Sequence, residues 1–218
     1  MSIKMSNIFL LRRLHSLSGV IPIGAFLIEH FYTNFAAVDG PQAFNDAVAH
    51  LRILLPGPLL PMAELLFIGL PIIFHASLGS YIAYTMRNNS ATYSYGRNWG
   101  YFLQRITGLF LIVYIALHVA SMRFGFWGLI GNHLSVDEHV DQAFTIVQAD
   151  LINPWIFAFY IIGVLAASYH FGFGLWSFGV HWGITVSERA QRVSLRLCTV
   201  IGVVVSILGL ASALAFVR

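Results

Sequence analysis

The chain has 218 residues, of which 58% are hydrophobic and only 10% are charged, whereas a soluble domain carries about 25% charged residues. A mean hydropathy of +0.76 therefore predicts an integral membrane protein rather than a large soluble core. The formal net charge is +3, but the twelve Lys and Arg form no basic patch, which argues against nucleic-acid binding. With Cys198 as its single cysteine, the chain alone cannot hold a disulfide, an iron–sulfur cluster or a covalently attached c-type haem.

Five apolar stretches are each long enough to cross a bilayer as a helix, which takes about 20 residues. Helices are the expected form, because extended segments would leave backbone polar groups unpaired in lipid. Pro22 and Pro71 lie inside two of these stretches and predict kinks. The expected spans are roughly residues 14–36, 59–85, 100–123, 153–180 and 195–217. We therefore predict a single all-α transmembrane domain over residues 1–218.

Basic residues gather on one side of the predicted spans. The nine on that side are Lys4, Arg12, Arg13, Arg87, Arg97, Arg105, Arg189, Arg192 and Arg196, and only Arg52, Arg123 and Arg218 lie on the other. Because cytoplasmic loops carry the excess of Lys and Arg, we predict a cytoplasmic N-terminus and an outer C-terminus. The first residues lack a small-residue cleavage site, so no removable signal peptide is expected. The longest outer connection, residues 124–152, is a candidate for an amphipathic surface helix.

Four histidines, His30, His75, His118 and His170, lie inside four different predicted spans. An ionisable side chain within a membrane is costly, so each is a candidate functional residue. With a rise of about 1.5 Å per residue, His75 and His170 lie roughly 16 Å from the cytoplasmic surface, and His30 and His118 roughly 25–28 Å. The four therefore form an inner pair and an outer pair, separated by on the order of 10 Å along the membrane normal.

Each histidine pair joins two helices, as cofactor sites in helix bundles commonly do. Structural zinc takes four ligands and catalytic zinc usually three, whereas two facing imidazoles fit the axial positions of a six-coordinate haem that carries one electron. Gly79 and Gly174 each follow an inner histidine by four residues, so they share its face and would let a flat macrocycle approach the backbone. The alternative is that the histidines only hydrogen-bond neighbouring helices.

Other polar residues near the span ends are candidates for contacts with these cofactors. Arg binds carboxylates well, so the candidate haem propionate contacts at the cytoplasmic end are Arg13, His15, Ser16, Arg105 and His181. Each of these also suits an ordinary interfacial anchor. At the outer end, Glu64 and His50 are candidates for proton transfer to a quinone, which needs a titratable group near the outer cofactor. Outer water is the alternative environment for Glu64 and for Glu29, and the one expected for His133 and His139.

Four segments resemble the cytochrome b subunits of succinate dehydrogenase and fumarate reductase: RRLHSLSGVIPIGAFLIEH, FHASLGSYIAYT, YSYGRNWGYFLQRITG and YHFGFGLWSFGVHWGITVSERAQR. The resemblance is narrowest to the single-subunit, five-helix, di-haem cytochrome b-558 type of menaquinone-using bacteria. It runs through nearly the whole chain, is weakest over 124–152, and includes the spacing of all four histidines. It implies that His75 and His170 ligate the haem b nearer the cytoplasm, and His30 and His118 the outer one. Glu29 departs from it, since a related protein has glutamine there.

The resemblance also implies two partner subunits on the cytoplasmic face: a flavoprotein with covalent FAD and a protein with three iron–sulfur clusters. This chain would anchor them in a bacterial cytoplasmic membrane and pass electrons through both haems to menaquinone, as part of a tricarboxylic acid cycle enzyme. The same parts would serve a quinol:fumarate reductase running in the opposite direction. The alternatives are a different di-haem b anchor, as in a hydrogenase or formate dehydrogenase, and a haem-free, histidine-lined transporter.

Overall fold

The computed structural model describes residues 5–54, 56–85, 92, 95–125, 135–136 and 138–218. Every regular element in these residues is helical, and five helices are long and apolar enough to cross a membrane. They run over Phe9–Asp39, Leu59–Thr85, Gly96–Met122, Pro154–His181 and Glu188–Ala215. The prediction of an all-α membrane protein with five spans is confirmed.

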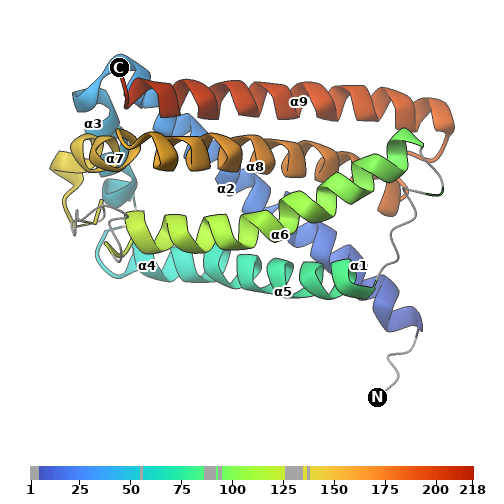
Figure 1. The fold of residues 1–218 in the computed structure, drawn as a ribbon. Helices are drawn as coiled ribbons and strands as arrows, with labels where there is room; N and C mark the ends of the chain where they lie inside the picture. The colour runs from blue at the N-terminus through green and yellow to red at the C-terminus, as the bar shows by residue number, and fades with distance from the viewer. Residues whose placement is uncertain (1–4, 55, 86–91, 93–94, 126–134, 137) are drawn as a thin grey trace.

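The first span is broken at the proline that predicted a kink. It consists of α1 (Met5–Val20), α2 (Pro22–Phe35) and a 3-10 turn, η1 (Ala36–Asp39). Pro22 is the first residue of α2, where its missing N–H costs nothing, and the turn at Ile21 separates the two helices. Figure 1 shows α1 and α2 following one another in a single oblique crossing.

The second span is interrupted just before its own proline. It consists of α4 (Leu59–Glu64), a π-helical turn η2 (Leu65–Gly69) and α5 (Leu70–Thr85). Pro71 cannot donate to a carbonyl four residues earlier, and the Leu70 N–H reaches back five residues to the Leu65 carbonyl. The π turn therefore lies directly after Glu64, and the expected kink takes this form.

The remaining spans are the single helices α6 (Gly96–Met122), α8 (Pro154–His181) and α9 (Glu188–Ala215). α9 begins seven residues before the predicted boundary at 195, because its start is set by a cap rather than by hydropathy. The Ser187 side chain accepts a hydrogen bond from the Ala190 N–H at 3.2 Å, and Glu188 occupies the first turn. Arg192 and Arg196, two of the basic residues on the side predicted to be cytoplasmic, both lie in α9.

Two shorter helices, α3 (Pro41–Leu54) and α7 (Ala143–Leu151), lie together with the C-terminal end of α9 at one end of the molecule (Figure 1). We call this the α3–α7 end, and the opposite one the α1 end. The rings of Phe44, Phe144 and Phe216 contact one another there. We expected an amphipathic helix at the surface within 124–152. A helix is present there, α7, but it does not lie at the surface, because most of its residues are buried against α3 and α8.

The spans form a bundle in which α9 lies on the outside. Figure 1 shows α9 packed along α8, with α6 and α5 beyond it and the first span crossing obliquely. Gly172 of α8 and Gly202 of α9 let these two backbones approach closely, since a Cβ on Gly172 would lie 2.9 Å from the Cys198 carbonyl oxygen. Large apolar side chains such as Phe67, Val113 and Val200 stay exposed, as expected for surfaces that face lipid.

Candidate cofactor-binding sites

The four histidines singled out by depth come from four of the five spans. His30 lies on α2, His75 on α5, His118 on α6 and His170 on α8. The ring centroids of His75 and His170 are 6.2 Å apart with the ring planes at 80°, and those of His30 and His118 are 5.7 Å apart at 81°. The structure therefore brings together the same two pairs that helix rise predicts.

In the inner pair, hydrogen bonds occupy one ring nitrogen of each imidazole. His75 Nδ1 lies 2.9 Å from the carbonyl oxygen of His15 on α1, so this nitrogen is the donor. His170 Nδ1 lies 3.2 Å from the hydroxyl oxygen of Thr107, which itself donates to the Leu103 carbonyl and so accepts from the histidine. Both networks assign the proton to Nδ1 and leave Nε2 without it. Nε2 is then the nitrogen able to bind a metal ion.

In the outer pair, His118 Nδ1 lies 3.2 Å from the hydroxyl oxygen of Tyr160 on α8, so this hydrogen bond engages Nδ1 rather than Nε2. The His30 ring packs beside Phe26, with centroids 5.3 Å apart. The neighbouring Glu29 carboxylate accepts a 2.6 Å hydrogen bond from Thr33 on its own helix. Sequence reasoning did not find Thr107 or Tyr160, because their roles depend on which helix faces which.

Two glycines hold neighbouring backbones against the inner imidazoles. A Cβ on Gly19 would lie 2.5 Å from Cε1 of His75, and one on Gly108 would lie 2.9 Å from Cε1 of His170. α1 and α6 can approach the two rings only because these positions lack a side chain. Gly79 and Gly174, the glycines we expected to face a macrocycle, face instead the His15 ring and the Gln104 side-chain nitrogen.

The spacing of each pair fits one metal ion held between two imidazoles. A ligating imidazole nitrogen lies about 2 Å from a metal, which sets two ring centroids on opposite sides of it roughly 6 Å apart. The observed 6.2 and 5.7 Å agree with this distance. Within the described part of the chain, no three His, Cys, Asp or Glu side chains gather to form a fuller ligand set. Such two-ligand sites suit an iron whose other four ligands belong to a macrocycle.

Three of the predicted anion contacts come together at the α1 end. The Arg13 guanidinium lies 3.5 Å from the His181 carbonyl oxygen, and the Trp182 indole N–H donates to the Ser16 hydroxyl at 3.2 Å. Arg13 also lies over the Trp182 ring, 5.1 Å from its centroid, and its buried Nε has no hydrogen-bond partner among the described residues. Arg13, Ser16 and His181 therefore form one polar group near the end of the inner pair.

The other two predicted contacts lie elsewhere. The His15 ring is stacked on His75, with centroids 4.0 Å apart and the planes at 13°, so it belongs to the inner histidine site rather than to the surface. Arg105 is half-buried on α6, and no hydrogen bond or ion pair to a described residue joins it to the Arg13 group. Next to it, the half-buried Gln104 donates to the His170 carbonyl at 3.0 Å, while its buried side-chain oxygen has no partner among the described residues.

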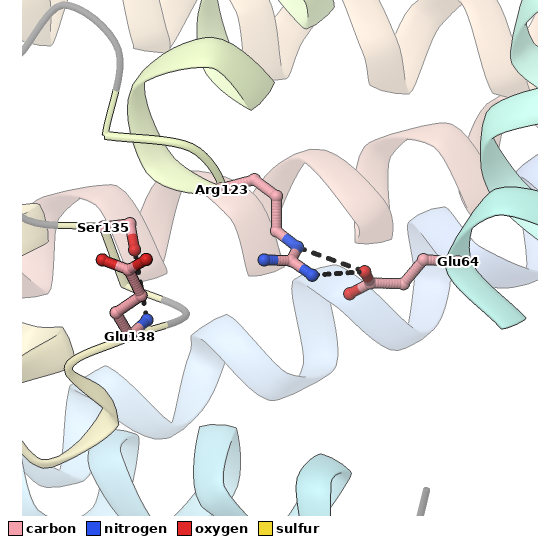
Figure 2. A network of polar contacts seen from close by, with 4 residues as sticks. All are labelled: Glu64, Arg123, Ser135 and Glu138. Carbon is pink, nitrogen blue, oxygen red and sulfur yellow. Dashed lines mark hydrogen bonds and ion pairs between the residues drawn. The ribbon is translucent and has the colours of Figure 1, made fainter. Parts of the chain in front are cut away.

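At the α3–α7 end, Glu64 forms an ion pair that sequence reasoning did not predict. Figure 2 shows Arg123, at the C-terminal cap of α6, directed at this carboxylate: its Nε and one terminal nitrogen donate to Glu64 Oε2 at 3.1 and 2.9 Å. The side chains of Arg123 and Glu64 are 28% and 35% exposed, so the pair reaches solvent. His50, the other predicted proton-transfer residue, is exposed on α3. His139 is half-buried, and His133 lies outside the described residues.

A buried acid lies at the same end of the bundle. Asp150 on α7 is only 5% exposed, and its Oδ2 accepts a 2.9 Å hydrogen bond from the Ser121 hydroxyl on α6. Burial raises the pKa of this carboxyl, and the Ser121 hydrogen bond opposes that shift. From the sequence Asp150 is one of several acids in an outer connection, because the burial of α7 cannot be read from its composition.

The fold defines a multi-pass integral membrane protein whose spans bring four histidines together as two facing pairs. The model of the succinate dehydrogenase/fumarate reductase transmembrane subunit family matches residues 83–209, and the chain belongs to this family. The succinate dehydrogenase cytochrome b558 subunit of Bacillus subtilis (strain 168) is 44% identical over 209 residues, which cover 96% of this chain and 97% of that protein. The chain is therefore a membrane subunit of a succinate dehydrogenase or fumarate reductase, an oxidoreductase complex.

Proposed function

We propose that this chain is the membrane-anchor, di-haem cytochrome b subunit of a succinate:menaquinone oxidoreductase, passing electrons between the iron–sulfur subunit and menaquinone. The observation that carries the proposal is the pair of bis-histidine sites, with ring centroids 6.2 and 5.7 Å apart between facing helices. The name of the Bacillus subtilis relative, a cytochrome b558 subunit, supports haem b as the bound group. When bound, each haem would supply a one-electron redox centre.

In this proposal His75 and His170 hold the haem nearer the α1 end, and His30 and His118 hold the other. The hydrogen bonds at Nδ1 orient three of these rings. His75 and His170 donate at Nδ1, which fixes their tautomer and raises the basicity of their Nε2 atoms. With two histidines holding each haem, no position at the metal would be left for water or oxygen, so each site would supply electron transfer only. α2, α5, α6 and α8 form the bundle around the two haems, and α9 supports it from outside.

At the α1 end, the polar group of Arg13, Ser16 and His181 binds the propionates of the inner haem. A guanidinium suits this task because its planar donors match a carboxylate, and the buried Arg13 Nε supports the assignment, since it has no partner among the described residues. His15 and Arg105 remain proposed contacts for the same propionates. The stacking of His15 on His75 gives His15 a second role, which is to hold the ring of the ligand.

We place the α1 end in the cytoplasm of a bacterial cell and the C-terminus outside the cytoplasmic membrane. The excess of Lys and Arg at the α1 end supports this orientation. The flavoprotein with FAD and the iron–sulfur protein then dock on the cytoplasmic face, above the inner haem. Residues 1–218 act as a single transmembrane cytochrome b domain that anchors the partner subunits and conducts electrons.

Menaquinone is reduced near the α3–α7 end. Oxidation of one succinate in the partner flavoprotein releases two electrons, and reduction of one menaquinone to menaquinol takes two electrons and two protons. Glu64 and His50 are the proposed proton-transfer residues, a role worth typically 10²–10⁴-fold in rate. The quinone site thus lies at least partly in this chain. Run in reverse, the same residues would serve a quinol:fumarate reductase. Family membership argues against a hydrogenase or formate dehydrogenase anchor and against a histidine-lined transporter.

The proposal is tested by counting and assigning haems in the purified complex. We expect two b-type haems per chain in the dithionite-reduced spectrum. His75→Ala or His170→Ala should remove or perturb one of them, and His30→Ala or His118→Ala the other. His139→Ala serves as the matched control and should leave both spectra unchanged. A preparation without a b-type band, or four variants that all affect the same haem, would contradict the proposal.

A further inference from the structure

The peptide around Glu64 departs from regular helix at the point where the carboxylate emerges. α4 ends at Glu64, and the next five residues form the π turn η2. Single π turns within membrane and soluble helices occur frequently at functional sites, because they change the direction in which side chains project. Glu64 is 35% exposed, which gives its carboxyl access to water at the α3–α7 end.

Arg123 contacts this carboxylate in an asymmetric way. Nε and a terminal nitrogen of the guanidinium both donate to the same oxygen, Oε2. An Arg–carboxylate pair more often forms two parallel bonds, one to each oxygen. Among the described residues, no side chain or backbone group donates to Glu64 Oε1. One carboxylate oxygen is thus held, while the other can meet a hydroxyl or carbonyl group of a ligand (Figure 2).

Arg123 is also fixed relative to the outer histidine site. It is the C-terminal cap of α6, five residues after His118, and its backbone N–H donates to the Val119 carbonyl at 3.0 Å. The helix that carries an outer ligand histidine therefore also carries the group that holds Glu64. A quinone reduced from the outer haem would need its proton donor at this end of α6.

We propose that Arg123 is a positioning residue for Glu64 during quinone reduction, an inference that rests on the proposed function. Glu64 in its acid form transfers a proton to a quinone oxygen, and the guanidinium stabilises the carboxylate that remains. The carboxylate then takes a proton from outer water and the cycle repeats, so that two electrons from succinate and two protons from water complete each menaquinol. An ion pair that only joined α4 to α6 would contribute little to the stability of the fold, because partly exposed ion pairs add little.

The test uses the intact three-subunit complex with Glu64→Gln, Arg123→Gln, Arg123→Lys and the double variant Glu64→Gln/Arg123→Gln. Succinate oxidation is measured with a soluble menaquinone analogue across pH, and separately with an artificial dye that accepts electrons at the partner subunits. We expect Glu64→Gln to lower kcat with the quinone by about 100-fold. Arg123→Gln should lower it by about tenfold, with KM changed much less, and should alter the pH profile. Arg123→Lys should recover part of the loss, and dye reduction should be unchanged throughout.

The double variant separates positioning from structure. If Arg123 acts through Glu64, the double variant is no slower than Glu64→Gln alone, because the two substitutions remove one interaction. Three outcomes would overturn the positioning role. The first is a double variant in which the rate losses of the two single variants multiply, and the second is an unchanged kcat in Arg123→Gln. The third is loss of the outer haem spectrum in both Arg123→Gln and Arg123→Lys. Full activity in Glu64→Gln would instead overturn the proton-transfer role in the proposed function. Arg218→Gln, at the same α3–α7 end of the bundle, is the matched control and should behave as the unmodified complex.

Discussion

Three of the four membrane histidines have Nδ1 committed to a group on a different helix. His75 is oriented by a backbone carbonyl of α1, His118 by a tyrosine of α8 and His170 by a threonine of α6. In proteins where a histidine ligates a metal, a hydrogen bond at its other ring nitrogen commonly fixes the orientation of the ring. These hydrogen bonds between helices therefore offset part of the free-energy cost of placing polar imidazoles in the membrane.

The buried acid Asp150 allows a test by pH. Because burial raises its pKa, the folded protein favours the protonated carboxyl. Its contribution to stability is fully present below the unfolded-state pKa and is lost as pH rises through the folded-state pKa. Asp150→Asn keeps an oxygen for the Ser121 hydroxyl but never carries a charge. We expect Asp150→Asn to unfold at a higher temperature than the unmodified protein at pH 8, with a difference that disappears near pH 4.

Thermal unfolding in detergent across pH measures this effect. For a chain of this size, each kcal/mol of charging cost corresponds to about 2–4 °C. Asp141→Asn, at an exposed position in the same connection, should show no such pH-dependent gain. Parallel pH profiles for Asp150→Asn and the unmodified protein would show that burial of this carboxyl costs the fold nothing.

At the residue scale, depth along a helix could be predicted from the sequence, and lateral contacts could not. Helix rise alone sorts His30, His75, His118 and His170 into the two pairs that the structure contains. The positions of His15 and Arg123 depend on how one helix is rotated against another. When all faces of a helix are apolar, its sequence does not indicate which face packs against the neighbouring helices. The roles assigned to Glu64, His50 and the propionate contacts remain predictions.

At the scale of the elements, glycines decide how closely α1 approaches α5. Gly19→Ala would place a methyl group 2.5 Å from Cε1 of His75, whose ring is held by hydrogen bonds to the His15 carbonyl and the Ser18 hydroxyl. The ring must shift or α1 must withdraw, and either change disturbs the inner site. We expect Gly19→Ala to perturb or remove the inner haem and to leave the outer haem intact.

Haem spectra of the purified complex measure this outcome. Gly96→Ala is the matched control, since a Cβ there meets nothing within 4 Å, and it should leave both haems unchanged. If Gly19→Ala binds both haems with native spectra and potentials, then the close approach of α1 is not required by the inner site.

The number of spans and the break in the first span could be predicted, because hydropathy and proline exert their effects within a short stretch of sequence. The second span matches its predicted bounds of 59–85, and the break at Pro22 occurs where the missing N–H requires it. The ends of α1 and α9 were misplaced, because these helices continue past the apolar stretch into residues that carry charge. α3 was not predicted, and α7 was expected at the surface. Their burial comes from contacts among three distant segments around Phe44, Phe144 and Phe216.

At the scale of the whole molecule, the two histidine pairs lie at different levels of the bundle, with different polar groups at each end. The α1 end has Arg13, Ser16 and His181 beside the inner pair, and the α3–α7 end has Glu64, Arg123 and the buried Asp150. α9 carries no histidine and packs on α8 and α2, so it supports the bundle without lining either site. The arrangement favours electron transfer from one side of the membrane to the other.

The most direct test of this account is the response of succinate oxidation to a membrane potential. Electrons that cross from the face bearing the partner subunits to a quinone at the other face move negative charge through the membrane, at up to about 2.3 kcal/mol per charge per 100 mV. In sealed proteoliposomes, making the partner-subunit side negative should therefore accelerate succinate-dependent menaquinone reduction. Reversing the potential should slow it, and an ionophore should abolish both effects. A rate that is the same at every imposed potential would contradict the transmembrane electron path.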